Sequence, residues 1–161
     1  MENHIIRKAN SSDVKDILRL LIELAVYEKD PDAVKISEKD LLDDGFGDNP
    51  RYECFIAEYN TEIVGLAFYT PRYSTWDGKT LHLEDLVVTE KMRGKGIGLS
   101  LYKSFLKEAK KQGVNRVEWS VLDWNKPAIN FYLKSGALID DYSKWKIVRM
   151  NKSLIEKFLS S

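Results

Sequence analysis

The stretch MRGKGIGLS, at residues 92–100, decides the fold of this chain of 161 residues. The apolar run LHLEDLVV at 81–88 precedes it and predicts a strand, and the run LSLYKSFLKEAKK at 99–111 follows it and predicts a helix. Glycine occupies every second position from Gly94 to Gly98, so the stretch predicts a strand-to-helix turn. Glycine permits a positive φ and lets a ligand approach the backbone closely.

The start of the helix that follows this turn favours an anion. The first N–H groups of a helix have no partner within the helix, and the helix dipole places partial positive charge there. Arg93 and Lys95 add two full positive charges, so the turn predicts an anion-binding site, in the first place for a phosphate ester. The alternative interpretation is a tight turn whose glycines serve packing alone.

The spacing of the glycines does not match the two common nucleotide motifs. A P-loop requires four residues between its first glycine and Gly-Lys-Ser/Thr, whereas Gly98 is followed by Leu99. A dinucleotide-binding turn requires Gly-x-Gly-x-x-Gly after a strand near the N-terminus, whereas this turn lies past the middle of the chain. Neither nucleotide class is therefore the expected ligand.

Composition and charge narrow the class of protein. Lys+Arg and Asp+Glu both number 25, and this balance gives no support to a nucleic-acid partner, which would select a basic excess. The single cysteine, Cys54, excludes an internal disulfide and disfavours a thiolate metal site, and its apolar neighbours predict a buried, inert thiol. Without a signal-peptide pattern or a membrane-length apolar run, we expect a cytoplasmic protein with no membrane partner.

Hydrophobic periodicity predicts helices and strands that alternate along one domain, residues 1–161. The expected helices lie at 11–28, from Ser37 to the glycines at 45 and 47, and at 99–112, 128–134 and 153–159. The expected strands lie at 4–8, 52–59, 63–69, 79–88, 114–122 and 145–150, with a loop at 73–78. The order β-α-α-β-β-β-α-β-α-β predicts a mixed α/β domain around one sheet.

The glycine-rich turn also belongs to a longer set of motifs. Residues 93–98 (RGKGIG) match Arg/Gln-x-x-Gly-x-Gly/Ala, the acetyl-CoA pyrophosphate loop of the GCN5-related N-acetyltransferase (GNAT) superfamily, which the order of elements also resembles. YE at 27–28, LED at 83–85 and NFY at 130–132 further resemble the spermidine/spermine N1-acetyltransferase family. The resemblance implies an α/β (α+β) fold with a central mixed, mostly antiparallel sheet flanked by helices.

The chemistry that the resemblance implies is acetyl transfer from acetyl-CoA, as co-substrate, to a primary amine by direct attack in a ternary complex, without a metal. An alkyl ammonium has a pKa near ~10.4, so such a site must remove a proton before the amine can attack. The thiolate that leaves benefits from a proton donor. A tyrosine can fill this role, with a pKa of about 10 against about 8.5 for a thiol.

For acetyl-CoA, the resemblance implies contacts from the strand end, from the glycine-rich turn and from the helix around Tyr132. The expected cofactor-binding residues are Leu86, Val87, Val88, Arg93, Gly94, Lys95, Gly96, Ile97, Gly98, Leu99, Asn125, Pro127, Ala128, Asn130 and Tyr132. Asn125 and Asn130 have helix capping as an alternative role.

For the amine, the resemblance implies a site lined by acids and aromatic rings. The expected substrate-binding residues are Tyr27, Glu28, Trp76, Glu84, Asp85 and Trp145, and the expected catalytic residues are Glu84 and Tyr132. Structural roles are the alternatives: a surface acid at Glu28, a packed ring at Tyr132, and tryptophans in a core or an interface.

Glu84 and Asp85 carry a further signal of their own. Adjacent strand residues point to opposite faces, so the two acids cannot both face solvent on an ordinary half-buried strand. Burying a charge is costly, so either the strand lies at an edge or one carboxylate faces a pocket. The superfamily carries a β-bulge here, which would redirect the side chains. His82, in the same strand, is expected to be structural, with proton relay as its alternative role.

Two departures from the polyamine-acetylating pattern bear on the acceptor. Ser74 stands where those enzymes carry an aspartate, and residues 143–144 (SK) precede Trp145 where they carry an acid. Fewer carboxylates weaken the binding of a long polycation. YSTW at 73–76 and LDWN at 122–125 instead resemble the thialysine N-ε-acetyltransferase branch, so we expect a small diamine or a lysine-like amino acid as acceptor.

Three other functions remain as alternatives. They are polyamine (spermidine/spermine) N1-acetylation, acetylation of protein lysines, and CoA binding without turnover. The last would keep the glycine-rich turn and lose the amine-site acids, which this chain retains. The resemblance also implies a homodimer.

Overall fold

The computed structural model describes residues 4–140 and 147–160. The chain divides into two compact units, residues 1–120 and 121–161, and each unit is described by itself. The single domain expected over residues 1–161 stays a prediction.

The first unit is built on a five-stranded sheet in the order β1-β2-β3-β4-β5, counted over the described residues. Its strands are β1 (His4–Lys8), β2 (Glu53–Tyr59), β3 (Glu62–Ser74), β4 (Gly78–Val88) and β5 (Arg116–Glu118). The first four pair antiparallel, and β5 joins β4 in parallel. The predicted mixed and mostly antiparallel sheet is confirmed.

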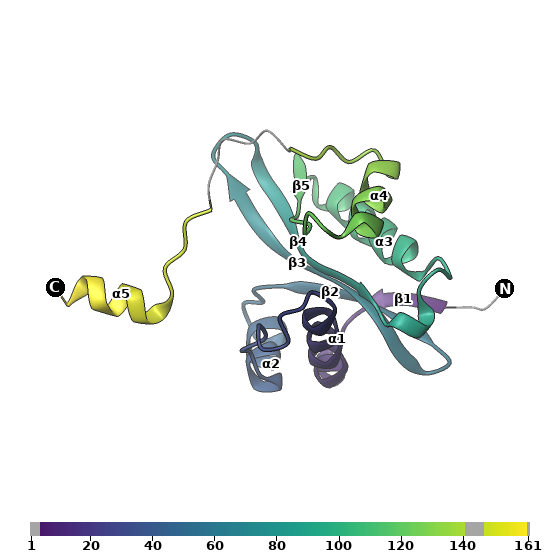
Figure 1. Ribbon diagram of the computed structural model, residues 1–161, viewed down its shortest axis with the longest axis horizontal. Coiled ribbons are helices and arrows are strands. Elements are labelled where there is room, and N and C mark those ends of the chain that lie inside the picture. The colour runs from purple at the N-terminus through teal and green to yellow at the C-terminus, as the bar shows by residue number, and fades with distance from the viewer. Residues whose placement is uncertain (1–3, 141–146, 161) are drawn as a thin grey trace. The chain divides into compact units, whose positions relative to one another are not determined.

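Helices cover both faces of this sheet. α1 (Val14–Tyr27) and α2 (Glu38–Phe46) lie against one face, and α3 (Ile97–Gln112) lies against the other (Figure 1). Short 3-10 turns, η1 (Ser11–Asp13) and η2 (Glu90–Met92), lead into α1 and toward α3. The second unit contains α4 (Lys126–Lys134) and α5 (Lys152–Leu159). None of the helices described is both long enough and apolar enough to cross a membrane.

Local sequence signals set the helix ends and the core. Ser37 and Asp40 cap the start of α2 with reciprocal hydrogen bonds, as their spacing predicted. Ile17 and Leu20 of α1 are fully buried in a core cluster that also contains Cys54 of β2. Cys54 is buried as predicted, and this burial raises the pKa of its thiol far above the usual value.

The hairpin between β3 and β4 is longer than the sequence predicted. β3 continues to Ser74 and β4 begins at Gly78, so the loop expected at 73–78 is a tight turn at the end of a long hairpin. Main-chain pairing runs the length of the hairpin and overrides the polar composition of its tip.

Two expected strands differ from the prediction. The strand expected at 114–122 narrows to β5, which pairs with β4 at three positions before the two segments separate. The strand expected at 145–150 is wrong for residues 147–150, which have no strand structure, while Trp145 lies outside the described residues. Apolar runs indicate extended backbone, but a strand also requires a neighbour with free N–H and C=O groups.

A β-bulge in β4 redirects the acids of the LED motif. Phe68 pairs with Asp85 and Tyr69 pairs with Leu83, so Glu84 is an extra residue with no partner in β3. The bulge that the resemblance implied is confirmed.

Candidate active site

Residues 93–98, here called the glycine turn, connect η2 to the start of α3. Gly94 and Gly96 have φ values of 77° and 81°. A Cβ at either position would meet no atom within 4 Å, so the backbone conformation, and not crowding, requires glycine. Gly96 is the N-cap residue of α3 and no side-chain hydrogen bond caps this helix. The first amides of α3 therefore remain open to a ligand.

The two basic side chains of the glycine turn lie over aromatic rings. The Arg93 guanidinium carbon is 4.6 Å from the centre of the Tyr27 ring, and its Nε donates to the carbonyl of Val88 at 3.0 Å. The Lys95 ammonium is 5.7 Å from the centre of the Tyr59 ring. Arg93 thus joins the turn to the ends of α1 and β4, and its expected contact with a phosphate stays a prediction.

The outer edge of β4 opens beside this turn. β5 pairs with β4 at Thr80–His82 only, so within the described sheet residues 83–88 have a strand partner on the β3 side alone. An unpaired edge offers main-chain hydrogen bonds to an extended ligand. Leu86, Val87 and Val88, expected to pair with the cofactor, lie on this stretch.

Three carboxylates form what is here called the acid cluster: Glu28, Glu84 and Asp85. Burial raises the pKa of Asp85 to about 6, and the negative charges of Glu28 and Glu84 add to the rise. Glu28 is the C-cap residue of α1, and partial desolvation raises the pKa of its carboxyl. Two negative charges that raise the pKa of a buried third carboxyl mark a place where a bound cation would be stabilised.

Neighbouring strands supply two residues that the sequence did not single out. The Thr70 hydroxyl on β3 donates to Glu84 Oε1 at 3.0 Å. Glu118 on β5 pairs in register with His82 on β4. His82 Nε2 lies 3.9 Å from Glu84 Oε2, so His82 links Glu118 to the acid cluster. Only the pairing register brings these residues together, and no local sequence pattern announces it.

The aromatic residues expected at the amine site are dispersed. Tyr27 lies against Arg93. Trp76 is 81% exposed at the tip of the β3–β4 hairpin, where the Ser74 hydroxyl accepts hydrogen bonds from the N–H groups of Trp76 and Asp77. From this tip, Glu84 lies roughly 20 Å along β4, so the two are not brought together within this unit. Trp145 is outside the described residues.

The second unit holds the remaining expected residues around α4. Asn125 is the N-cap residue of α4 and accepts a hydrogen bond from the Ala128 N–H at 3.3 Å, the capping role that was its alternative. Tyr132 is buried, with its ring 5.3 Å from that of Phe131 in an edge-on contact, and Asn130 is exposed. Contacts of α4 with a cofactor stay predictions.

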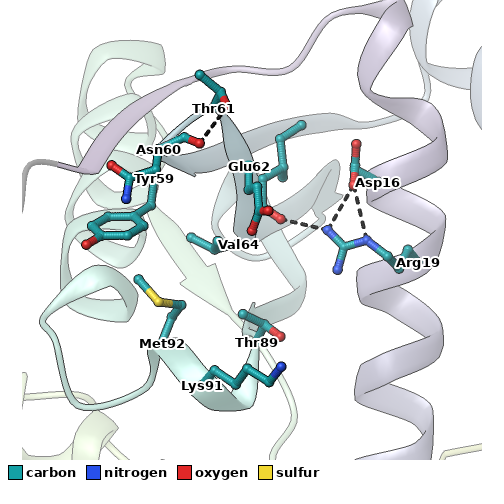
Figure 2. A pocket seen from close by; sticks show the side chains of 11 residues that line it. Asp16, Arg19, Tyr59, Asn60, Thr61, Glu62, Val64, Thr89, Lys91 and Met92 are labelled. Carbon is teal, nitrogen blue, oxygen red and sulfur yellow. Dashed lines mark hydrogen bonds and ion pairs between the residues drawn. The ribbon is translucent and has the colours of Figure 1, made fainter.

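A separate cavity of about 720 Å³ lies between α1, the β2–β3 turn and η2 (Figure 2). Its lining residues are Asp16, Arg19, Tyr59, Asn60, Thr61, Glu62, Ile63, Val64, Thr89, Lys91 and Met92. None of the expected site residues lines it. Two acids and two bases balance in charge, and Arg19 already binds Asp16 and the carbonyl of Ile63. The cavity therefore selects neither cations nor anions.

Comparison with known proteins decides the family. A model of the acetyltransferase (GNAT) family matches residues 15–137. The chain belongs to this family. It is an N-acetyltransferase, and members of the GNAT family use acetyl-CoA as co-substrate.

Individual relatives cover most of the chain. The thialysine N-epsilon-acetyltransferase of Bos taurus is 43% identical over 141 residues, which are 83% of each chain. The spermidine/spermine N(1)-acetyltransferase-like protein 1 of Homo sapiens is 39% identical over 94% of this chain and 23% of its own length. An integron cassette protein from the mobile metagenome of V. cholerae has a TM-score of 0.77 and 25% identity, covering 100% of this chain and 99% of that one.

Metal chemistry has no candidate site in the described part of this GNAT chain. No group of three or more His, Cys, Asp or Glu side chains there could hold a metal ion.

Proposed function

We propose that this GNAT enzyme transfers acetyl from acetyl-CoA to the primary amine of a small diamine or a lysine-like amino acid, in a ternary complex. The acid cluster carries the proposal, because Asp85 has a pKa raised by burial and by the charges of Glu28 and Glu84. A bound ammonium group would relieve this repulsion. The name of the bovine relative favours a lysine-like acceptor.

On the donor side, two features of the first unit fit acetyl-CoA. The open amides at the start of α3, between Gly96 and Leu99, suit its pyrophosphate. The unpaired edge of β4 at Leu86–Val88 suits its extended arm. When bound, acetyl-CoA supplies the thioester carbon that the amine attacks.

On the acceptor side, Asp85 and Glu84 have different roles because their surroundings differ. Asp85 is the more buried carboxyl and serves as a fixed charge that attracts the ammonium. Glu84 is exposed and held by Thr70, so it can receive the proton that the ammonium loses. We further propose that the hydroxyl of Tyr132 donates a proton to the departing thiolate.

Polyamine N1-acetylation is the second candidate, favoured by the name of the human relative. Ser74 argues against it, since its hydroxyl caps the turn at Trp76 and Asp77 and adds no carboxylate for a long polycation.

An acceptor panel tests the proposal. Thialysine, lysine, spermidine and a histone-like peptide are each incubated with enzyme and acetyl-CoA, and release of CoA thiol is followed. We expect thialysine to give the highest kcat/KM. A higher value for spermidine would replace the proposal with the second candidate, preference for the peptide would indicate a protein acetyltransferase, and absence of turnover with all four would leave a CoA-binding module.

We also propose a homodimer in the cytoplasm. Apolar side chains near the C-terminus are largely exposed, namely Ile147, Val148, Phe158 and Leu159. A second copy of the chain would cover such surface. Light scattering should give twice the mass of one chain, and a monomer at assay concentrations would contradict the dimer. The cytoplasmic location stays a prediction.

A further inference from the structure

His82 has a buried ring nitrogen that lacks a hydrogen-bond partner. The atom is Nδ1, and it is the one buried side-chain nitrogen or oxygen of the described residues in this condition. It lies 3.9 Å from Glu118 Oε1, while Nε2 on the other side of the ring lies 3.9 Å from Glu84 Oε2. A buried polar atom without a partner is costly, so the ring position calls for a reason.

Register explains why the ring stands between the two acids. His82 pairs with Thr70 on β3 and with Glu118 on β5, and Glu84 follows two residues later on β4. Each ring nitrogen therefore faces one carboxylate. Both gaps exceed a hydrogen bond, and a small rotation of a side chain would close each of them.

We propose that Glu118, His82 and Glu84 form a proton relay of the amine site, in which His82 stores the proton that Glu84 takes from the acceptor ammonium. This inference rests on the proposed function. His82 acts through Glu84 and does not touch the substrate, so it is a positioning residue.

The proton balance is simple. An N–H bond of the ammonium breaks and Glu84 becomes protonated. Glu84 then passes the proton to the lone pair on His82 Nε2, and Glu84 is a carboxylate again. The imidazolium that forms keeps its Nδ1–H toward Glu118 and loses its Nε2 proton to water, which restores the neutral ring and returns the site to its starting charge.

An imidazole such as that of His82 is well suited to store a proton between two carboxylates. An ordinary histidine has a pKa of about 6.5 and an ordinary glutamic acid about 4.3, so near neutral pH an imidazole holds a proton about a hundredfold better. Proton storage on His82 thereby frees Glu84 for the next ammonium.

Ion pairs from two strands hold the Glu118 carboxylate beside His82. Arg72 of β3 forms an ion pair with Glu118, and Arg116 of β5 binds its other oxygen at 3.0 Å. Asp77 in turn binds Arg116. Glu118 is thus held in place by two guanidinium groups, so it orients the ring and balances the imidazolium charge without taking the proton itself.

The test compares the two histidines of the chain. His82→Gln removes the titrating ring and keeps a polar side chain of similar reach. His4→Gln is the matched control, since His4 bonds to Ser100 Oγ at 2.8 Å and lies outside the acid cluster. With thialysine as acceptor, we expect His82→Gln to lower kcat about tenfold to a hundredfold at pH 7, with KM values for both substrates changed less than about twofold. The loss should shrink toward pH 9, where more of the amine is already neutral.

A purely structural histidine would give a different result. The relay is overturned if His82→Gln keeps the wild-type pH profile, or if it lowers kcat by one factor at every pH. Imidazole added to His82→Ala should restore part of the activity at pH 7, and absence of rescue in a variant with wild-type Tm would equally contradict it. If wild-type enzyme acetylates no amine of the panel, the proposed function itself fails, which is a distinct outcome.

An activity-independent readout covers variants that fold poorly. In ¹⁵N NMR spectra of the wild-type protein and of Glu118→Gln at one pH, we expect the His82 ring to carry its proton on Nδ1 in the wild type and to lose this preference once the carboxylate is neutral. An unchanged ring spectrum would remove Glu118 from the relay.

Discussion

The glycine turn and the acid cluster are built from different parts of the chain. The turn presents backbone, because two glycines with positive φ lead into an α3 start that no side-chain hydrogen bond caps. The cluster presents side chains from the end of α1 and from a bulge in β4, whose charges act on Asp85. A backbone site depends on one local conformation, whereas a side-chain cluster depends on the register of several strands. The two regions should therefore fail in different ways when they are mutated.

The largest effect is expected at Tyr132, which tests whether the two regions serve one turnover. Tyr132→Phe should lower kcat about tenfold to a thousandfold, because the departing thiolate loses its proton donor. Calorimetry should give an unchanged Kd for acetyl-CoA. Unchanged turnover across the pH range would end the proposed role of the hydroxyl.

Gly96 tests the backbone site by strain. Gly96→Val forces a β-branched residue to φ near 81°, which costs about 1–2 kcal/mol and displaces the open amides. KM for acetyl-CoA should rise about thirtyfold, with KM for the amine unchanged when acetyl-CoA is saturating. Gly113→Val is the control, since Gly113 ends the same helix at φ 66°. Gly113→Val should lower Tm about as much as Gly96→Val does and leave KM for acetyl-CoA unchanged. Equal KM values for acetyl-CoA in the two variants would contradict a cofactor role for the glycine turn.

Glu84 tests the side-chain site by charge. Glu84→Gln keeps the shape and removes one negative charge beside the ammonium, so KM for the amine should rise about tenfold while KM for acetyl-CoA stays constant. It also removes the proposed proton acceptor, so kcat should fall at least as far as in His82→Gln. Glu62→Gln, on the lining of the separate cavity, is a matched control and should change neither constant. If Glu84→Gln leaves the amine KM at the wild-type value, Glu84 does not bind the amine.

The smallest effect is on stability, and its sign separates two acids. The folded-state pKa of Asp85, about 6, exceeds its unfolded value of 3.8, so the folded protein binds more protons between these pH values and loses stability as pH rises through them. Asp85→Asn should therefore be more stable than wild type at pH 7, by at most about 3 kcal/mol for a shift of about two pKa units, with the difference lost below pH 4. Urea unfolding at both pH values measures this.

Asp40 provides the opposite sign in the same experiment. Its hydrogen bonds with Ser37 lower the pKa of the Asp40 carboxyl, so its contribution is present at neutral pH and is lost as pH falls. Asp40→Asn should destabilise the protein at pH 7. If both substitutions change the stability at pH 7 in the same direction, the burial and charge repulsion assigned to Asp85 are contradicted.

Residues whose role depends on adjacent sequence were predictable. The glycine turn, the Ser37–Asp40 cap and the burial of Cys54 each follow from a few neighbouring residues. The bulge at Glu84 followed from family resemblance, since nothing in an apolar strand announces an extra residue. Thr70 was not predictable, because it reaches the acid cluster only through strand pairing.

Strand extent was the least predictable feature of the fold. β5 has three residues although the strand expected around it is three times as long, since β4 pairs with only part of that segment. The end of such pairing depends on both strands, so it cannot be predicted from the sequence of one. Residues 147–150 were predicted to form a strand because their composition is typical of one. They form none, since composition does not supply a partner strand.

The burial of Cys54 has a practical consequence for every assay that counts released thiols. Its sulfur lies in the core, and its thiolate form is strongly disfavoured there. A disulfide reagent added to the folded enzyme will therefore react with free CoA and leave the protein unlabelled. The same reagent will label the chain once it unfolds, so one dye reports turnover in native buffer and loss of structure in urea.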